Sequence, residues 1–237
     1  MRLWNGWGNE DSDLTMELSD GLRTLLEALV GSGTALSQAT LNEVIAKVPN
    51  TRLDDHPLIK TDPETRVRHA RGQSLPDWLE MHSGNVDTFP DGVAFPESSE
   101  QVRELLAHAK ENNLIVIPYG GGTSVVGHIN PETSDKPVLT IDMAKMNSML
   151  SIDTESQLAT FGAGAPGPVV EEELKKHGYT LGHFPQSWEL STLGGWVASR
   201  SSGQQSLHYG RIENMFAGGT IETLNGTMTI PTIPASS

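Results

Sequence analysis

A glycine-rich stretch that directly follows a short apolar segment is the part of this sequence best suited to binding chemistry. Residues 114–117 are apolar and mostly β-branched, which predicts a buried strand, and Pro118-Tyr119-Gly120-Gly121-Gly122-Thr123-Ser124 comes next. Glycines have no Cβ, so this backbone can turn sharply and approach a ligand closely. Successive N–H groups in such a turn can point at one anion, and the hydroxyls of Thr123 and Ser124 add uncharged donors. The stretch predicts a diphosphate site, although an ordinary glycine-rich connection has the same composition.

The two common nucleotide-binding patterns do not describe this stretch. A Walker loop ends in Gly-Lys-Ser/Thr, but the residues directly before and after Ser124 are not lysines. The Rossmann pattern must open a helix, and residues 125–131 make a poor first turn because they are rich in β-branched side chains and end at Pro131. The predicted diphosphate site therefore belongs to another fold.

The composition excludes several kinds of partner and site. The 237 residues include 16 basic and 30 acidic side chains, and the net charge of −14 argues against nucleic acid as the main partner. There is no cysteine, and the eight histidines show neither an HExxH pattern nor a close ligand pair, so we expect no metal site. The sequence has no apolar run long enough for a membrane span and no apolar secretory segment at its start, so we expect a cytoplasmic protein.

The first third of the chain predicts a helical leader. Trp4 and Trp7 predict an arm that docks on a larger body, because two tryptophans are costly to leave in water. Helices are predicted at 20–30, 41–48 and 75–81, with a linker at 50–65. The basic cluster of residues 66–72 either contacts a ligand phosphate or flavin edge, or pairs with nearby carboxylates, which we favour.

The rest of the chain alternates strands and helices. A helix is predicted after Ser98, which is spaced with Gln101 as a capping box. Further predicted elements are a strand at 138–143, a hairpin at 148–162, helices at 169–177 and 193–199, and a hairpin at 220–230 around an Asn-Gly turn. Gly194 and Gly195 cost the 193–199 helix about 1 kcal/mol each relative to alanine, which close approach of another backbone or a flat ligand would explain.

Several stretches, taken together in this order and spacing, resemble the FAD-binding domain of the PCMH-type flavoenzymes (the vanillyl-alcohol oxidase superfamily). They are residues 118–124, the Ala163-Gly164 turn, residues 191–196 with Ser202-Gly203, and residues 209–213. Within that superfamily they are most similar to the alkyldihydroxyacetonephosphate synthase family of ether-lipid synthesis, whose leader also resembles residues 4–8 and 66–72.

The resemblance implies an α+β protein with a PCMH-type FAD-binding fold of two α/β subdomains, preceded by a helical N-terminal segment. The leader would be residues 1–85 and the FAD-binding domain residues 86–237, divided into subdomains 86–145 and 146–237, the second incomplete at its C-terminus. Non-covalent FAD is implied, because Thr123 stands where covalent members carry a histidine. Gln186 departs from the family pattern, which prefers an aspartate there.

The resemblance also assigns residues to parts of FAD. The implied diphosphate contacts are Pro118, Gly120, Gly121, Gly122, Thr123 and Ser124. The implied flavin and ribityl contacts are Pro185, Ser187, Ser191, Thr192, Gly194 and Gly195, with Ser199, Ser202 and Gly203 nearby. Ile221 and Glu222 would lie at the adenine end, and His183 and His208 flank the flavin block, more simply as loop histidines than as flavin contacts.

The implied reaction is the exchange of an acyl for an alkyl group on dihydroxyacetone phosphate. The family places its catalytic residues in a cap domain that would follow the Pro-Ala-Ser-Ser end, so no catalytic residue is assigned and this chain is expected to be inactive alone. Two alternatives stay open: an FAD-linked 2-hydroxy-acid dehydrogenase or oxidase, and a flavin-binding fragment without turnover. A lipid-phosphate or 2-hydroxy-acid substrate would bind through the missing domain, and a homodimer and peripheral membrane contact are compatible with the sequence.

Overall fold

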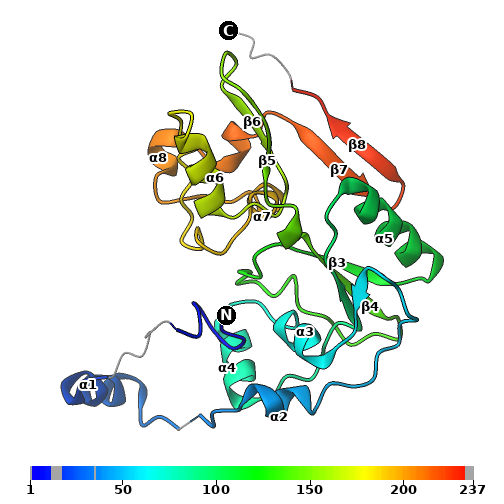
Figure 1. Ribbon diagram of the computed structural model, residues 1–237. Helices are drawn as coiled ribbons and strands as arrows, with labels where there is room; N and C mark the ends of the chain where they lie inside the picture. Colours follow the sequence, from blue (N-terminus) through cyan, green and yellow to red (C-terminus); the bar gives the residue numbers. More distant parts are fainter. Residues whose placement is uncertain (1, 12–17, 35, 233–237) are drawn as a thin grey trace.

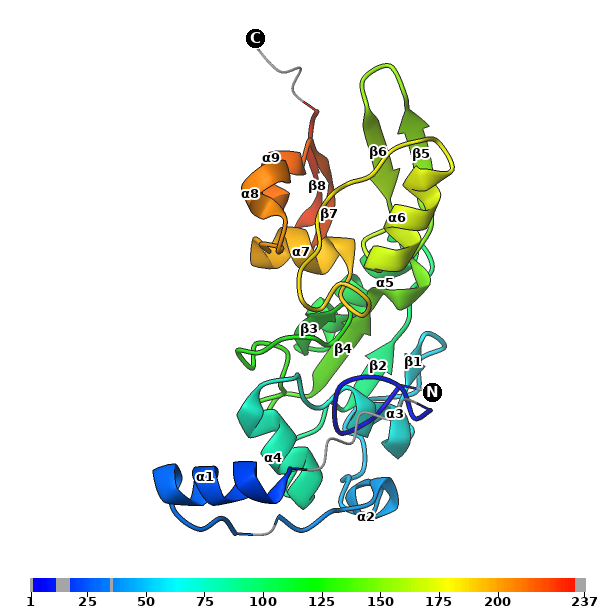
Figure 2. The same ribbon diagram turned by 90° about the vertical axis from the view of Figure 1, so that its left-hand side faces the viewer.

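The computed structural model describes residues 2–11, 18–34 and 36–232, which form two parts stacked end to end (Figures 1 and 2). The N-terminal elements are α1 (Asp20–Val30), α2 (Leu41–Ile45), β1 (Ile59–Lys60), α3 (Pro63–Arg68) and α4 (Leu75–Ser83). They continue into β2 (Gly92–Ala94), α5 (Ser99–Glu111), β3 (Ile115–Tyr119), β4 (Val138–Asp142) and the short 3-10 helix η1 (Met143–Lys145).

The first part is built on a four-stranded sheet of order β1-β2-β4-β3. β2, β4 and β3 are parallel, and β1 is antiparallel at the edge, with Ile59 opposite Ala94. All five residues of β4 are buried, as expected for a central parallel strand. The predicted linker at 50–65 was wrong in part, because it contains β1 and the start of α3 and so joins the leader to this sheet.

The two faces of the sheet are covered by different segments. Leu105 of α5 packs on one face with Ala94, Leu139 and Ile141. The other face, with Ile117 and Tyr119 of β3, is covered by the loop that carries Ile129. A separate apolar cluster joins α2, α3 and α4, and its members are Val44, Val67, Ala70, Met81, Val86 and Phe89, with Trp4 packed against them. The predicted docking of the tryptophan arm is therefore confirmed for Trp4.

The second part holds two hairpins and four helices. Its elements are β5 (Met149–Asp153), β6 (Leu158–Phe161), α6 (Gly167–Lys175), α7 (Leu193–Ser199), α8 (Ser206–Tyr209), α9 (Ile212–Met215), β7 (Gly219–Thr223) and β8 (Gly226–Ile230). β5 pairs with β6 and β7 with β8, each as a separate two-stranded sheet. Ala165, Val170 and Leu174 form its small core with Phe161 and Leu181 around α6.

Local sequence signals account for most helix ends. Ser98 caps α5 by accepting from the Gln101 N–H, but the Gln101 side chain accepts from the N–H of Glu97 rather than that of Ser98, so the predicted capping box is only half formed. Gly84 ends α4 in the left-handed conformation. The leucine-rich helix α1 forms where predicted but has no buried residue and projects away from the sheet (Figures 1 and 2).

Candidate functional site

The glycine-rich segment starts at the C-terminal end of β3, where parallel strands of an α/β sheet commonly present ligand-binding loops. Tyr119, the last residue of β3, lies opposite Asp142 of β4. Within the described residues, the backbone N–H groups of residues 120–124 donate no hydrogen bond to the protein. Backbone donors are normally paired, and five consecutive free ones form a suitable binding surface for an anion.

The first two glycines are required by a second loop as well as by any ligand. A Cβ on Gly120 would overlap Oγ1 of Thr192, and a Cβ on Gly121 would overlap the carbonyl oxygen of Leu190. The glycine loop (residues 118–124) thus lies directly against residues 190–192. The structure therefore brings together the residues predicted to bind the diphosphate and two of those predicted to border the flavin, Ser191 and Thr192. Close packing against this second loop is therefore a reason for both glycines, and the sequence alone did not separate it from contact with a ligand.

The third glycine has both a conformational and a steric reason. Gly122 has φ +64°, in the left-handed region, and a Cβ there would overlap the hydroxyl of Tyr119. The Tyr119 ring contacts the ring of His69, whose Nε2 lies 3.0 Å from Oδ2 of Asp142. Burial raises the pKa of Tyr119 to about 12, so its hydroxyl is protonated under the loop at neutral pH.

The segment opposite the glycine loop presents one unpaired hydroxyl. Oγ1 of Thr192 is buried and has no hydrogen-bond partner among the described residues, although Thr192 is the N-cap residue directly before α7. The hydroxyl of Ser191, by contrast, donates to the carbonyl of Ser187 at 2.8 Å and accepts from Nε1 of Trp196 at 2.6 Å. Thr192 therefore has a free donor beside the loop, while Ser187 and Ser191 stabilise the local turn.

The two helix glycines differ in what surrounds them. A Cβ on Gly194 would lie 2.8 Å from the backbone carbonyl oxygen of Ala163, so the predicted close approach of another backbone is confirmed there. Gly195 is exposed, and outside its own helix the one neighbour that its Cβ would meet among the described residues is Oγ1 of Thr192 at 3.3 Å. Among the described residues, the space beside Gly195 is therefore otherwise open.

The other residues expected near the flavin are less closely placed. Pro185 is buried and its carbonyl accepts from Trp188, and Gly203 packs against the backbone of Phe184. Ser199 donates to the carbonyl of Gly195 at 2.7 Å but is exposed, as is Ser202. No hydrogen bond among the described residues joins these positions to the glycine loop, so their contact with FAD stays a prediction.

His183 is buried with only one ring nitrogen paired. Its Nε2 lies 3.1 Å from the hydroxyl of Ser201, and its Nδ1 has no partner in the described structure. Burial lowers the pKa of His183, so the ring is neutral at pH 7. His208 is exposed and packs its ring edge against Tyr209.

The residues expected at the adenine end lie on the β7–β8 hairpin, beside α5 (Figure 1). Glu222 pairs with Arg103 of α5 at 2.8 Å and accepts from the hydroxyl of Thr227 at 2.6 Å. Ile221 is 42% exposed. The structure does not bring either residue into contact with the glycine loop, and a role at the adenine stays a prediction.

The basic cluster of the leader mostly serves the protein itself. Arg71 pairs with Glu80 at 2.6 Å and Asp87 at 2.9 Å, and Arg68 pairs with Glu64 at 2.9 Å, as favoured from the sequence. Arg66 is buried and donates instead to the carbonyls of Pro90 and Pro49.

The residue that sequence reasoning missed at the glycine loop is Arg2. Its guanidinium donates to the carbonyl of Gly121 across the fold. Nothing in the spacing of an arginine at position 2 could have indicated a partner 119 residues away.

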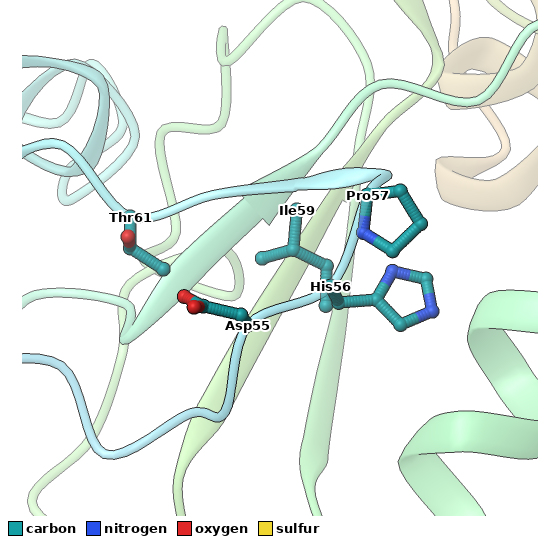
Figure 3. Close-up of a pocket in the computed structure, with 5 residues that line it drawn as sticks. All are labelled: Asp55, His56, Pro57, Ile59 and Thr61. Carbon is teal, nitrogen blue, oxygen red and sulfur yellow. The ribbon is translucent and has the colours of Figure 1, made fainter.

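The structure also has a hollow that lies away from the glycine loop. The hollow in Figure 3 has a volume of about 330 Å³, lies at the edge strand β1, and is lined by Asp55, His56, Pro57, Ile59 and Thr61. Among the described residues, no group of His, Asp and Glu is arranged to hold a metal ion. In the same part of the chain, no helix combines the length and apolarity needed to cross a bilayer.

Comparison with known proteins agrees with this geometry. The chain is 41% identical over 175 residues to alkyldihydroxyacetonephosphate synthase of Dictyostelium discoideum, and the matched region covers 71% of this chain and 29% of that protein. A solved structure of alkyldihydroxyacetonephosphate synthase superposes with a TM-score of 0.83 at 31% identity, covering 99% of this chain and 50% of the other. A mitochondrial D-lactate dehydrogenase (cytochrome) of Saccharomyces cerevisiae is 30% identical over 152 residues, covering 64% of this chain and 25% of that protein.

The matches thus span less than a third of the length of these two relatives and half of the solved structure. The site residues suit FAD, an anionic dinucleotide, because free amides and an unpaired buried hydroxyl can donate to its diphosphate and closely packed glycines leave the backbone accessible. Residues 90–230 match the family described as the FAD binding domain, which is more than half of the chain. This protein belongs to the FAD-binding domain family.

Proposed function

We propose that this chain is the FAD-binding part of an alkyldihydroxyacetonephosphate synthase, an enzyme that replaces the acyl group of an acyl-dihydroxyacetone phosphate with an alkyl group. The observation that carries the proposal is the row of free N–H groups at residues 120–124, in a chain that superposes over 99% of its length on a synthase of that name. Bound FAD supplies the reactive flavin, and the protein supplies its binding and orientation.

In this proposal each side of the site has a distinct task. The amides of residues 120–124 donate to the diphosphate, which needs no cationic side chain in the loop. The free hydroxyl of Thr192 donates to the same region from the opposite side, and the exposed Gly195 leaves room for the flavin or its ribityl chain. FAD is held non-covalently, because Thr123 offers no histidine for attachment.

The substrate pocket and the catalytic groups come from protein outside this chain, which covers only 29% of the Dictyostelium relative. We therefore propose that the chain alone does not turn over substrate and binds FAD with mid-micromolar affinity or worse. Cytoplasmic location, homodimer formation and peripheral membrane contact are further predictions that depend on the complete protein.

The test is an absorbance spectrum of the purified chain after incubation with FAD and gel filtration. We expect the flavin absorbance bands to shift when FAD is titrated with the chain, and we expect no flavin to remain with the protein after the column. In a mixture that has not passed the column, acid precipitation should leave all of the flavin in solution. Bands retained near 1:1 stoichiometry would contradict weak binding, bands retained after acid would contradict non-covalent attachment, and the absence of any binding would refute the assignment.

The similarity to D-lactate dehydrogenase favours one alternative, an FAD-linked 2-hydroxy-acid dehydrogenase. The complete protein should be assayed with acyl-dihydroxyacetone phosphate plus a long-chain alcohol, and in parallel with D-lactate plus an electron-accepting dye. The synthase proposal expects product only in the first assay. Turnover of D-lactate alone would establish the alternative.

A further inference from the structure

The N-terminal arm reaches the glycine loop through one side chain. The guanidinium of Arg2 donates to the carbonyl of Gly121, the middle glycine. No other lysine or arginine of the described residues bonds to residues 118–124, and that segment itself carries no charged side chain. Arg2 is thus a cation placed on a neutral loop in a chain of net charge −14.

The arm is held in place by contacts of its own. The backbones of Arg2 and Asn9 form an isolated antiparallel β-bridge, and the N–H of Leu3 donates to the carbonyl of Gly8 at 3.0 Å. These contacts close the arm into a small loop. Arg68 of α3 donates to the carbonyl of Arg2 at 2.9 Å. It also lies 3.4 Å from the carboxylate of Glu10, so one arginine binds both ends of the arm.

Trp4 adds an apolar anchor, because it packs against the buried cluster of α2, α3 and α4. The position of Arg2 is therefore fixed by the body of the leader and not by the glycine loop alone. An arm anchored in this way can hold the loop in one conformation.

The hydrogen bond to Gly121 determines which way one peptide faces. In a planar trans peptide the C=O and the following N–H point in opposite directions. Because the Gly121 carbonyl points at Arg2, the N–H of Gly122 points away from Arg2, and it donates to no acceptor among the described residues. A peptide between two glycines can turn over at little conformational cost, which would place a carbonyl oxygen where the phosphate binds.

We propose that Arg2 is a positioning residue for the FAD diphosphate, which locks the Gly121–Gly122 peptide with its N–H toward the ligand. It acts from the far side of the loop and does not itself contact FAD. The inference rests on the proposed function and extends it to the leader, because docking of the arm and binding of the diphosphate then stabilise each other.

The test compares Arg2→Met with Arg23→Met, each in the 237-residue chain with a C-terminal tag so that the arm is undisturbed. Arg23 is an exposed arginine of α1, so its variant removes the same charge away from the loop. Dissociation constants are measured for FAD and for riboflavin, which shares the flavin and ribityl chain but lacks the diphosphate. Arg2→Met should weaken FAD binding about tenfold or more, as expected for a charged hydrogen bond, and leave riboflavin binding within about twofold.

Arg2→Lys should recover part of the lost FAD affinity, because its ammonium can still donate to the Gly121 carbonyl. Hydrogen exchange at the N–H of Leu3 provides a second measurement, and FAD should slow it more than riboflavin does in the unaltered chain. Equal FAD affinity of Arg2→Met and Arg23→Met would overturn the inference, as would an equal loss for both ligands. Failure of the unaltered chain to bind FAD would refute the proposed function instead. This outcome differs from failure of the Arg2 inference because it is seen in the unaltered chain, without any variant.

Discussion

Replacing Thr192 by valine is expected to raise stability and weaken FAD binding at the same time. Oγ1 of Thr192 is buried without a partner among the described residues, and the side chain makes no capping bond to α7. An unpaired buried hydroxyl costs about 1–3 kcal/mol, and valine keeps nearly the same shape. Thr192→Val should therefore raise the free energy of unfolding of the FAD-free chain by about 1 kcal/mol, and its Tm by roughly 2–4 °C.

The effect on the cofactor has the opposite sign. If the hydroxyl donates to FAD, its removal loses one hydrogen bond, about 1 kcal/mol, which corresponds to roughly a fivefold weaker dissociation constant. Thermal unfolding without FAD and a titration of flavin fluorescence measure the two quantities on the same preparation. A general loss of structure cannot raise the stability while weakening FAD binding, because it lowers both the stability and the FAD affinity.

Thr140 provides the matched control. Its Oγ1 is also buried without a partner in the described structure, but it lies within β4 and is not among the residues expected to contact FAD. Thr140→Val should raise the Tm in the same way and leave FAD affinity unchanged. The reasoning is refuted if Thr192→Val binds FAD as tightly as Thr140→Val does, or if it lowers the Tm, which would mean that the hydroxyl has a partner in the free chain.

Two further perturbations test the packing around the site. Gly121→Ala should lower the free energy of unfolding by about 1–3 kcal/mol and impair FAD binding, because the new Cβ overlaps the carbonyl of Leu190. Gly33→Ala should do neither, because a Cβ there meets no atom of the described residues within 4 Å. Equal unfolding midpoints of the two variants in urea would contradict this. Burial alone would raise the pKa of Asp91, but hydrogen bonds, chiefly from Arg52, outweigh it and hold the pKa below its usual value. The stability that Asp91 contributes is therefore present above about pH 4 and is lost as the pH falls through its lowered pKa. The difference in unfolding free energy between the protein and Asp91→Asn should shrink below about pH 4, and a difference that stays constant to pH 2 would exclude this account.

Several local features that neighbouring residues decide were well predicted. The Asn225-Gly226 pair predicts the turn between β7 and β8, and Gly84 predicts the end of α4. The spacing of the leucines likewise predicts α1. These signals depend on a few adjacent residues, so no knowledge of the rest of the fold is needed to interpret them.

Long-range contacts were beyond such reasoning. Residues 59–60 are too short a segment to predict as a strand, and they form one only because β2 offers an edge to pair with. The predicted amphipathic face of α1 implied burial, yet Leu25, Leu29 and Val30 of that helix are exposed. Periodicity reports which face of a helix is apolar, and not whether another element covers it.

The glycine loop illustrates the division between the two kinds of information. From the sequence alone it follows that three glycines and two hydroxyl residues after a strand can form an anion site, because that depends on the absence of Cβ atoms and on local backbone freedom. Only the tertiary structure determines that Gly121 lies between Leu190 and Arg2, contributed by segments far away along the chain. Sequence distance carries no information about such contacts, because they arise from the packing of the whole chain.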